Sequence, residues 1–239
     1  MTLLSLDNLS KTYGALKVTD GISLDVGQGE LVGILGPNGA GKTTLFNLIA
    51  GTVRPNSGQV LFKGQNITAH DASTRCRMGI SRSFQIPNPF NGMTVFENIL
   101  VGATFGRNGP GPEARAAEVL ELTGLKRRAN DRAGALTLLE RKRLEMARAL
   151  ATDPSLLLLD EIAGGLTERE CQSLLAAVGD VHSSGVTIVW IEHVVHALLS
   201  VAKRLIVVDF GRKIADGLPA EVLASKAVQS VYMGADAHV

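Results

Sequence analysis

Apolar and polar residues follow two kinds of pattern along this chain, one typical of β-strands and the other of α-helices. Wholly apolar runs at 31–35 and 156–159 are typical of strands buried on both faces, whereas residues 3–26 alternate as half-exposed strands do. Other segments carry helical periodicity, or a capping signal before them and glycine after them. We expect strands at 3–26, 31–35, 59–62, 80–84, 156–159, 186–191, 204–209 and 213–215, and helices at 44–50, 71–78, 94–101, 113–123, 141–150 and 167–182, with a short closing helix from Pro219.

The segment from 86 to 150 differs from the rest because its predicted elements are helices. It opens with a loop at 86–92, where Pro87 and Pro89 remove two backbone donors, and its best candidate for a flexible connector is 106–112. Strands alternate with helices on either side of it, which is typical of an α/β fold. We expect one domain over residues 1–239, with 86–150 inserted as a helical subdomain.

The charge balance argues against nucleic acid as a partner. Lys and Arg number 24 and Asp and Glu 23, and basic runs such as 126–128 are expected to be solvated helix faces. The two cysteines, Cys76 and Cys171, lack metal-ligand spacing and indicate a reducing compartment. No signal-peptide pattern opens the chain, and no apolar stretch approaches the roughly 20 residues that span a bilayer. Work at a membrane would therefore need a partner.

The motif with the clearest chemistry is GPNGAGKTT at 36–44, between a predicted strand and a predicted helix. Its glycines allow a tight turn that points successive backbone N–H groups into one concavity at the positive end of the helix. Such a concavity fits a polyphosphate. Lys42 would reach the β- and γ-phosphates, and the Thr43 hydroxyl would hold Mg²⁺. The alternative is a chance glycine-rich turn, which the flanking strand and helix disfavour.

Further polar residues stand where predicted strands end, namely Gln85, Asp160, Glu161 and His193. Ligands of open α/β sheets bind beyond the carboxyl ends of strands. Asp160 could bind the same Mg²⁺, and Glu161 could polarise an attacking water. Gln85 could complete the metal and water shell, and His193 could sense the γ-phosphate. Taken singly, an Asp-Glu pair is more often a helix cap and a strand-end histidine more often structural, but their order along the chain favours one site.

With these motifs in place, the chain resembles the ATP-binding cassette (ABC) ATPases from Leu3 to about Gly217. Residues 36–44 are similar to the Walker A loop of that family, Gln85 to its Q-loop, 156–161 to its Walker B strand with the catalytic glutamate, and His193 to its switch histidine. The resemblance implies a P-loop NTPase core, with a mixed, mainly parallel sheet flanked by helices. It also implies an N-terminal antiparallel β subdomain and the inserted helical subdomain, with ATP and Mg²⁺ as ligands.

The resemblance also assigns roles to single residues. Tyr13 by itself would be an ordinary half-buried aromatic at a strand end, whereas the resemblance makes it the residue that stacks on adenine. The implied site residues are Tyr13, Asn38, Gly39, Ala40, Gly41, Lys42, Thr43 and Thr44 for the nucleotide, Thr43, Gln85 and Asp160 for the metal, and Glu161, His193 and Gln85 for catalysis. Within the family, residues 84–87, 93–99, 160–166 and 231–234 are similar to ATP-binding subunits of high-affinity branched-chain amino acid importers.

The chain departs from the family pattern in the signature segment, which is usually Leu-Ser-Gly-Gly-Gln and completes the ATP site of a facing cassette. Here residues 136–140 read Leu-Thr-Leu-Leu-Glu. Thr137 keeps a hydroxyl, but Leu138 and Leu139 replace the glycines, and Glu140 adds negative charge near a phosphate. We therefore expect this chain to pair with a different cassette, whose intact signature completes the site of this one.

The implied function is the ATP-hydrolysing subunit of a membrane importer for branched-chain amino acids or a related small polar solute. The implied partners are a second ABC ATPase chain, transmembrane permease subunits that grip the loop 86–90, and indirectly a solute-binding protein, at the cytoplasmic face of the cell membrane. A loop packed into its own domain is the alternative for 86–90. Two other functions stay open: a regulatory or structural cassette with little turnover, and a soluble ABC ATPase outside transport, which usually carries coiled-coil insertions or a second cassette.

Overall fold

The computed structural model describes residues 1–107 and 111–235, in which the chain forms two compact units. The first unit comprises Met1–Ala72 and Val189–Val239, and the second Ser73–Ile188. Helix α2 (Ala72–Met78) and strand β8 (Thr187–Ile191) lie across the divisions. Part of the predicted connector 106–112, namely 108–110, lies outside the described residues.

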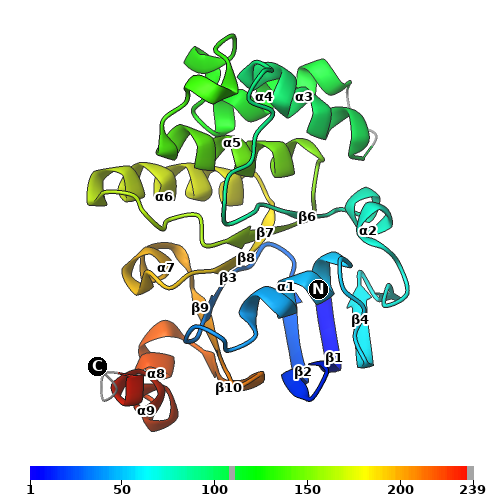
Figure 1. Cartoon of the computed structure of the whole chain (residues 1–239), viewed down its shortest axis with the longest axis vertical. Helices are drawn as coiled ribbons and strands as arrows, with labels where there is room; N and C mark the ends of the chain where they lie inside the picture. Colours follow the sequence, from blue (N-terminus) through cyan, green and yellow to red (C-terminus); the bar gives the residue numbers. More distant parts are fainter. Residues whose placement is uncertain (108–110, 236–239) are drawn as a thin grey trace. The chain divides into compact units, whose positions relative to one another are not determined.

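An antiparallel sheet forms the N-terminal part of the first unit (Figure 1). Its strand order is β2-β1-β4-β5, with β1 at Thr2–Tyr13, β2 at Leu16–Gly27, β4 at Ser57–Phe62 and β5 at Gln65–Asn66. On one face Leu6 pairs with Leu24, and Leu4 pairs with Phe62, and all of these side chains are buried. The alternation over 3–26 therefore marks the face of the sheet that packs into the core.

The phosphate-loop motif follows a parallel strand of the same unit. Strand β3 (Leu31–Leu35) is buried at every position and pairs in parallel with β9 (Arg204–Asp209), while β10 (Arg212–Gly217) is antiparallel to β9. The helices of this unit are α1 (Lys42–Ala50), α7 (Val195–Val201), α8 (Pro219–Ala224) and α9 (Lys226–Ala235). The sequence did not predict α7, and it predicted one closing helix where there are two, because Ser225 between α8 and α9 has an extended conformation.

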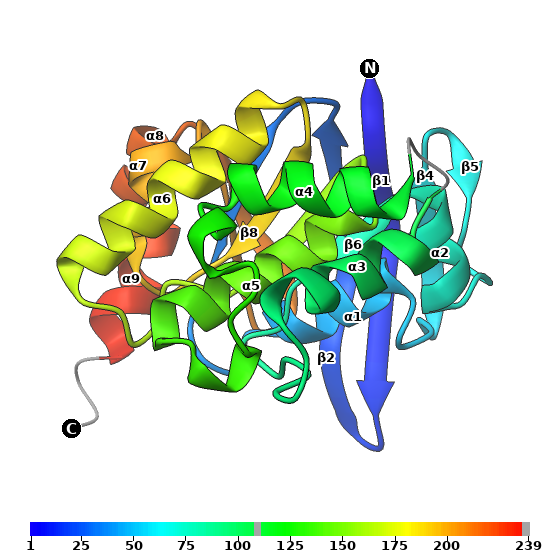
Figure 2. The ribbon, with the colours of Figure 1, turned by 90° about the horizontal axis from the view of Figure 1, so that it is seen from above.

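The second unit combines a parallel strand pair with a group of helices. Strand β6 (Ile80–Arg82) pairs in parallel with β7 (Leu156–Asp160). The helices are α3 (Val95–Phe105), α4 (Pro112–Leu122), α5 (Leu138–Ala151) and α6 (Glu168–Ser183), with short 3₁₀ turns at Lys126–Arg128 and Ala133–Ala135. Helices α3, α4 and α5 pack side by side (Figure 2). Parallel strands with flanking helices, beside an antiparallel sheet, confirm the predicted α/β class.

Capping boxes begin α3, α5 and α6 of the second unit. In each, a threonine hydroxyl accepts the N–H of a glutamate three residues later, whose carboxylate accepts the N–H of the threonine. The boxes at Thr94 and Thr167 were expected from the sequence. The box at Thr137 was not, and it corrects the predicted start of α5 from residue 141 to Leu138.

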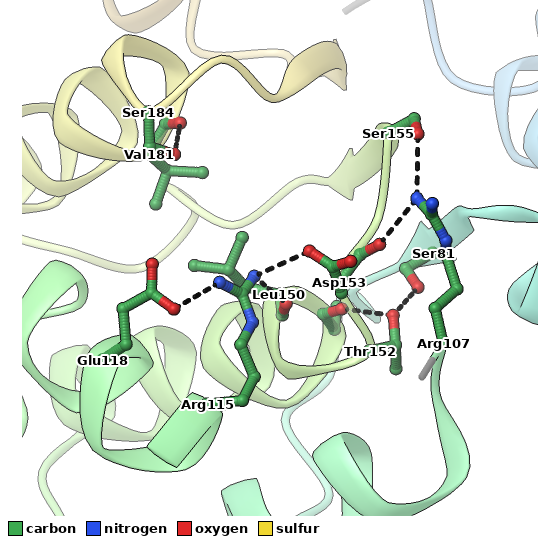
Figure 3. A network of polar contacts seen from close by, with 11 residues as sticks. Ser81, Arg107, Arg115, Glu118, Leu150, Thr152, Asp153, Ser155, Val181 and Ser184 are labelled. Atoms are coloured by element: carbon green, nitrogen blue, oxygen red, sulfur yellow. Dashed lines mark hydrogen bonds and ion pairs between the residues drawn. The ribbon is translucent and has the colours of Figure 1, made fainter. Parts of the chain in front are cut away.

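A polar network fixes the turn that leads into β7 (Figure 3). Arg115 of α4 donates to Leu150 O at 2.8 Å and lies 3.7 Å from the Asp153 carboxylate. Arg107, just after α3, donates to Asp153 O at 3.3 Å and to Ser155 Oγ at 3.1 Å. These contacts attach α3 and α4 to the start of the strand that ends at Asp160.

None of the helices that the structure describes is long and apolar enough to cross a bilayer.

Candidate functional site: a phosphate loop and a strand-end carboxylate pair

The loop between β3 and α1 has a backbone that only glycine allows at its two ends. Gly36, Gly39 and Gly41 have φ values of 156°, 81° and 98°. A Cβ at Gly36 would lie 2.1 Å from Val208 O, and one at Gly41 would lie 2.4 Å from Val18 O. At Gly39 a Cβ would meet nothing within 4 Å, so this glycine is required by its dihedral angle alone. The glycine spacing in the sequence thus reflects two close backbone contacts and three positive φ angles.

Helix α1 presents its N-terminus to this loop. Its N-cap is Gly41, and no side chain of the described residues caps its first turn. Uncapped amides and the helix dipole together favour an anion. The buried Lys42 folds back along the loop and donates to Gly36 O at 2.7 Å and Pro37 O at 2.9 Å, while Thr43 is exposed. This set of amides, one cation and a hydroxyl fits a polyphosphate.

A pocket of about 660 Å³ adjoins the loop within the first unit. The predicted nucleotide contacts Asn38, Gly39 and Ala40 line it. Its other walls are Leu16, Pro37, Asp209, Phe210, Ser230 and Val231. The pocket therefore extends from the loop to the C-terminal helix α9, which sequence reasoning did not connect with the site.

In the second unit, Gln85 and Glu161 are in direct contact. The Gln85 side-chain amide donates to Glu161 Oε2 at 2.6 Å, although the two residues are far apart in the sequence. Glu161 has a φ of 46°, a left-handed conformation that is uncommon for a residue with a long side chain. Lys142 of α5 donates to its backbone carbonyl at 3.3 Å. The carboxylate that the sequence placed as catalytic is thus held on its side chain and on its backbone.

Asp160, the last residue of β7, is buried against Arg82 of β6. The Arg82 guanidinium lies 2.5 Å from Asp160 Oδ2, and both side chains are almost fully buried. The other carboxylate oxygen, Oδ1, is buried and has no hydrogen-bond partner among the described residues. An orphaned carboxylate oxygen is a good ligand for a hard cation such as Mg²⁺ or for its water. Sequence reasoning missed Arg82, the last residue of β6, because no motif marks it.

His193 follows β8 and is exposed over about half of its side chain. Beside it, the wholly buried Glu192 accepts the backbone N–H groups of His193 at 3.2 Å and Val194 at 3.4 Å. The Glu192 carboxylate also lies 3.8 Å from His193 Nδ1. Glu192 therefore shapes the turn that presents the histidine, and it is a second residue that sequence reasoning passed over.

Tyr13 is the last residue of β1, and its side chain is 47% exposed. The Lys11 ammonium lies 5.2 Å from the centroid of its ring. About half of Tyr13 is therefore open to solvent, and both the strand-end aromatic and the adenine-stacking residue stay predictions.

The altered signature segment begins helix α5. Its Thr137 hydroxyl accepts from Glu140 N, and Glu140 accepts from Thr137 N at 2.9 Å and from Arg128 Nε at 2.8 Å. Burial tends to raise the pKa of Glu140, but the hydrogen bonds from Thr137 and Arg128 outweigh it and lower the pKa below its usual 4.5. Leu138 is 45% exposed and Leu139 is half-buried. The charge that the sequence placed near a phosphate is thus largely paired within its own chain.

The predicted site residues are divided between the units. Tyr13, residues 38–44 and His193 belong to the first unit, and Gln85, Asp160, Glu161 and the signature segment to the second. Of the predicted catalytic residues, the structure brings Gln85 and Glu161 together.

The comparisons with protein families agree with the motifs. The sequence model of the ABC transporter family matches residues 19–164. A second model, described as the branched-chain amino acid ATP-binding cassette transporter, matches residues 212–238.

Curated relatives align over nearly the whole chain. The lipopolysaccharide export system ATP-binding protein LptB of Haemophilus influenzae is 34% identical over 236 residues, which cover 98% of this chain and 98% of LptB. The high-affinity branched-chain amino acid transport ATP-binding protein LivG of Escherichia coli is 33% identical over 249 residues, which cover 97% and 98% respectively.

Solved structures share the fold. The ADP conformation of MJ1267, an ATP-binding cassette of an ABC transporter, matches with a TM-score of 0.89 at 31% identity, over 98% of this chain and 99% of that one. A dimeric post-hydrolysis state of the ATP-binding cassette MJ0796, bound to ADP and Pi, matches with a TM-score of 0.80 at 25% identity, over 91% and 99%. From its motifs, its fold and these relatives, this chain belongs to the ABC transporter family, as an ATP-binding subunit.

Proposed function

We propose that this chain hydrolyses ATP as a subunit of a membrane importer, and that the solute is a branched-chain amino acid or a related small polar compound. The match of residues 212–238 to the branched-chain model and the 33% identity to LivG support this solute class. LptB, which is named for lipopolysaccharide export, is 34% identical to this chain. Overall identity alone therefore does not separate an amino acid from lipopolysaccharide as the solute. The C-terminal match is what favours the amino acid.

The main support for ATP hydrolysis by this chain is the contact between Gln85 and Glu161. A general base needs its carboxylate held in position to reach the proton, and the Glu161 carboxylate is held by Gln85 just beyond the end of β7. In the proposed reaction Glu161 accepts a proton from the water that attacks the γ-phosphate, and Gln85 orients the carboxylate and that water. His193 is proposed to sense the γ-phosphate.

The nucleotide is proposed to bind by its phosphates at residues 38–44, where Lys42 and the start of α1 supply positive charge, with Tyr13 stacked on adenine. Mg²⁺, when bound, neutralises charge on the β- and γ-phosphates. The residues proposed to hold it are Thr43, Asp160 and Gln85. The orphaned Asp160 Oδ1 supports a metal or a metal-bound water as its partner.

We further propose that this cassette pairs with a different one. The dimeric MJ0796 structure supports pairing in general. The exposed Leu138 supports a weak signature, because it stands where the usual segment has glycine and adds a side chain where the backbone would approach a phosphate. An intact signature on the partner would then complete the Walker site of this chain. Brisk, cooperative ATP hydrolysis by a homodimer of this chain would contradict this part of the proposal.

The loop 86–90 is the proposed docking site for a cytoplasmic helix of the permease, which would hold the chain peripherally at the cytoplasmic face of the membrane. The Asn88 N–H donates to the Glu145 carboxylate at 3.0 Å, so the backbone is anchored. The Ile86 and Phe90 side chains are nevertheless 78% and 44% exposed. A fixed backbone that presents apolar side chains suits a partner helix. A Phe90→Asp variant that assembled and transported normally would favour a loop without a partner.

A second function, an ATP-binding cassette with a regulatory role and little turnover, is supported by the altered signature. The two functions differ in the ratio of ATP binding to turnover. A regulatory cassette binds ATP at micromolar concentrations, while Glu161→Gln in the assembled complex leaves its ATPase rate unchanged. In the proposed motor the same substitution stops turnover.

The test of the solute class is made on the complex with its own membrane subunits in lipid nanodiscs. Phosphate release is measured with the binding protein of the system loaded with leucine, isoleucine or valine, and with lysine or lipopolysaccharide as controls. We expect stimulation by the branched-chain amino acids alone. Stimulation by lipopolysaccharide would refute the proposed solute class, and stimulation by none of these amino acids would refute a branched-chain amino acid as the solute.

A further inference from the structure

The loop 86–90 is held by its backbone, although it exposes apolar side chains. At Asn88 the N–H donates to the Glu145 carboxylate at 3.0 Å, and the carbonyl accepts from the Arg148 guanidinium at 3.1 Å. Glu145 and Arg148, both of α5, are themselves joined by an ion pair of 2.8 Å. Both backbone polar groups of Asn88 are thus fixed by one helix of the second unit.

Phe90 is held in a similar way by Asn98 of α3, the helix beside α5 (Figure 2). Asn98 Oδ1 accepts the Phe90 N–H at 2.8 Å, and Asn98 Nδ2 donates to Phe90 O at 3.1 Å and to Thr94 O at 2.9 Å. A side-chain amide carries the donor and the acceptor of a peptide group. Asn98 therefore pairs with the Phe90 backbone as a neighbouring strand would.

The hydrogen bond to the Phe90 N–H depends most on the Asn98 side chain. The Phe90 carbonyl also accepts from Met93 N, at 3.0 Å. Thr94 O also accepts from the Asn98 backbone N–H, at 3.0 Å. For the Phe90 N–H, Asn98 Oδ1 is the acceptor that the described residues supply. Removing the side-chain amide would therefore release the Phe90 N–H.

The burial of Asn98 indicates that its amide has a specific use. Asn98 is fully buried, as are Val95 and Ile99 on the same face of α3. Burying an amide costs free energy unless its polar atoms are hydrogen-bonded, so a residue used only for packing would be apolar here, as Val95 and Ile99 are. The contact with Phe90 accounts for an amide at this position.

The ring of Phe90 is supported by α5. The Arg148 guanidinium carbon lies 4.8 Å from the ring centroid, within the range of a cation–π contact. Phe90 is nevertheless 44% exposed. Helix α3 thus fixes the backbone of Phe90 and α5 supports its ring, while the exposed part of the residue stays available to a partner.

We propose that Asn98 is a positioning residue for docking of the permease: its side-chain amide fixes the Phe90 backbone, so that the ring is presented to the membrane subunit before the two chains meet. A surface that is ordered in advance loses less conformational freedom on association and therefore binds more tightly. The inference rests on the proposed docking of the loop 86–90. It adds a buried residue of α3 to the residues on which assembly depends.

The experiment compares the full-length chain with Asn98→Leu, which keeps a similar volume and removes the three side-chain hydrogen bonds. Thr123→Val is the matched control, because it removes a buried hydroxyl that donates to Val119 O at 2.7 Å in the same unit. Thermal unfolding first shows whether both variants fold. Binding of the labelled chain to its own membrane subunits in nanodiscs is then titrated. We expect Asn98→Leu to dock about three- to tenfold more weakly, as the loss of one hydrogen bond predicts, and Thr123→Val to dock as the wild type does.

A double-mutant cycle with Phe90→Ala separates positioning from a general loss of stability. In the Phe90→Ala background, Asn98→Leu should weaken docking no further, because there is no ring to position. An equal loss in both backgrounds, or a loss in neither, would overturn the positioning role of Asn98. A Phe90→Ala variant that docks as the wild type does would instead overturn the proposed docking at this loop.

Hydrogen exchange of the isolated wild-type chain tests the same contact without any substitution. The Phe90 amide should exchange about tenfold or more slowly than the amide of Asn91, an exposed residue of the same segment. Equal exchange at the two positions would overturn the positioning role. This measurement decides the proposal even where Asn98→Leu fails to fold.

Discussion

The side-chain amide of Gln85 donates a 2.6 Å hydrogen bond to Glu161, and so joins the loop that follows β6 to the residue that follows β7. Gln85 also precedes the loop 86–90, in which Ile86 and Phe90 expose apolar side chains. Any movement of that loop that displaced Gln85 would therefore release the Glu161 carboxylate. In the proposed transporter, this contact would make the catalytic base sensitive to the docking of the permease.

Glu161→Gln should reduce ATP hydrolysis by about 10²- to 10⁴-fold, because a side-chain amide cannot accept the proton of the attacking water. Binding of ATP should be retained, since the phosphate loop is unchanged. Phosphate release and nucleotide affinity are measured on the assembled complex. The control is Glu113→Gln, the same chemical change at an exposed position of α4. Hydrolysis within twofold of wild type in Glu161→Gln would show that another group is the base.

Arg82→Met should lower the free energy of unfolding by about 3 kcal/mol, because it leaves the Asp160 carboxylate buried without its cation. Adding Asp160→Asn should recover part of that loss. Urea denaturation of both variants measures the coupling. The comparison is Arg212→Met, which removes an exposed ion pair with Asp20 and should cost less than about 1 kcal/mol. Equal losses at Arg82 and Arg212 would mean that burial of the first pair has no effect.

Thr137→Ala should destabilise the chain by about 1 kcal/mol, because it removes the N-cap of α5. Thr137→Ser keeps the capping hydroxyl and also restores the usual family residue, so it should unfold within a few tenths of a kcal/mol of wild type. Chemical denaturation measures both. If the alanine and serine variants unfolded alike, the hydroxyl would not be acting as a cap.

Asp216→Asn should make stability less sensitive to acid. Asp216 accepts from Arg204 Nε at 2.7 Å and from Lys213 at 2.9 Å; burial tends to raise its pKa, but these hydrogen bonds lower it below 3.8. A carboxylate whose pKa is lower in the folded state stabilises the protein above its unfolded pKa, and this contribution is lost as pH falls through the folded pKa. The variant should be less stable by about 2 kcal/mol at pH 7, with the gap closing below pH 3.8.

Urea denaturation at pH 7, 5 and 3 measures that gap. Asp180→Asn on α6, an exposed position, should show a small and pH-independent difference from wild type. A gap at Asp216 that stayed constant down to pH 3 would mean that its pKa is not lowered by folding.

Much of the fold could be predicted because buried strands and helix caps leave recognisable patterns within short stretches of the sequence. The runs that became β3 and β7 are buried at every position, and the boxes at Thr94 and Thr167 begin helices as expected. The box at Thr137 has the same Thr-x-x-Glu pattern, but the resemblance to a signature segment drew attention to Glu140 as a charge near phosphate. One local pattern can therefore fit two roles, and the fold shows that Glu140 caps the helix.

The site could be predicted only where one motif carries it. The glycines of 36–41 have the positive φ angles that a phosphate loop requires. Arg82 had no such signal, because it acts on a residue that only the fold brings near. Glu192 acts on its own neighbours, His193 and Val194, but no motif marks it. Arg82 meets Asp160 only when β6 pairs with β7. Long-range pairing of this kind leaves no fixed spacing to find.

In the proposed mechanism, the left-handed backbone of Glu161 sets selection for stability against selection for ATP turnover. A residue with a Cβ pays roughly 1–2 kcal/mol to hold this conformation, and glycine or asparagine adopts it more readily. A library screened for heat resistance alone should therefore enrich glycine and asparagine at position 161, and in the proposed mechanism those variants would lose ATP hydrolysis. Selection for thermostable versions of this subunit has to score ATP turnover in the same round.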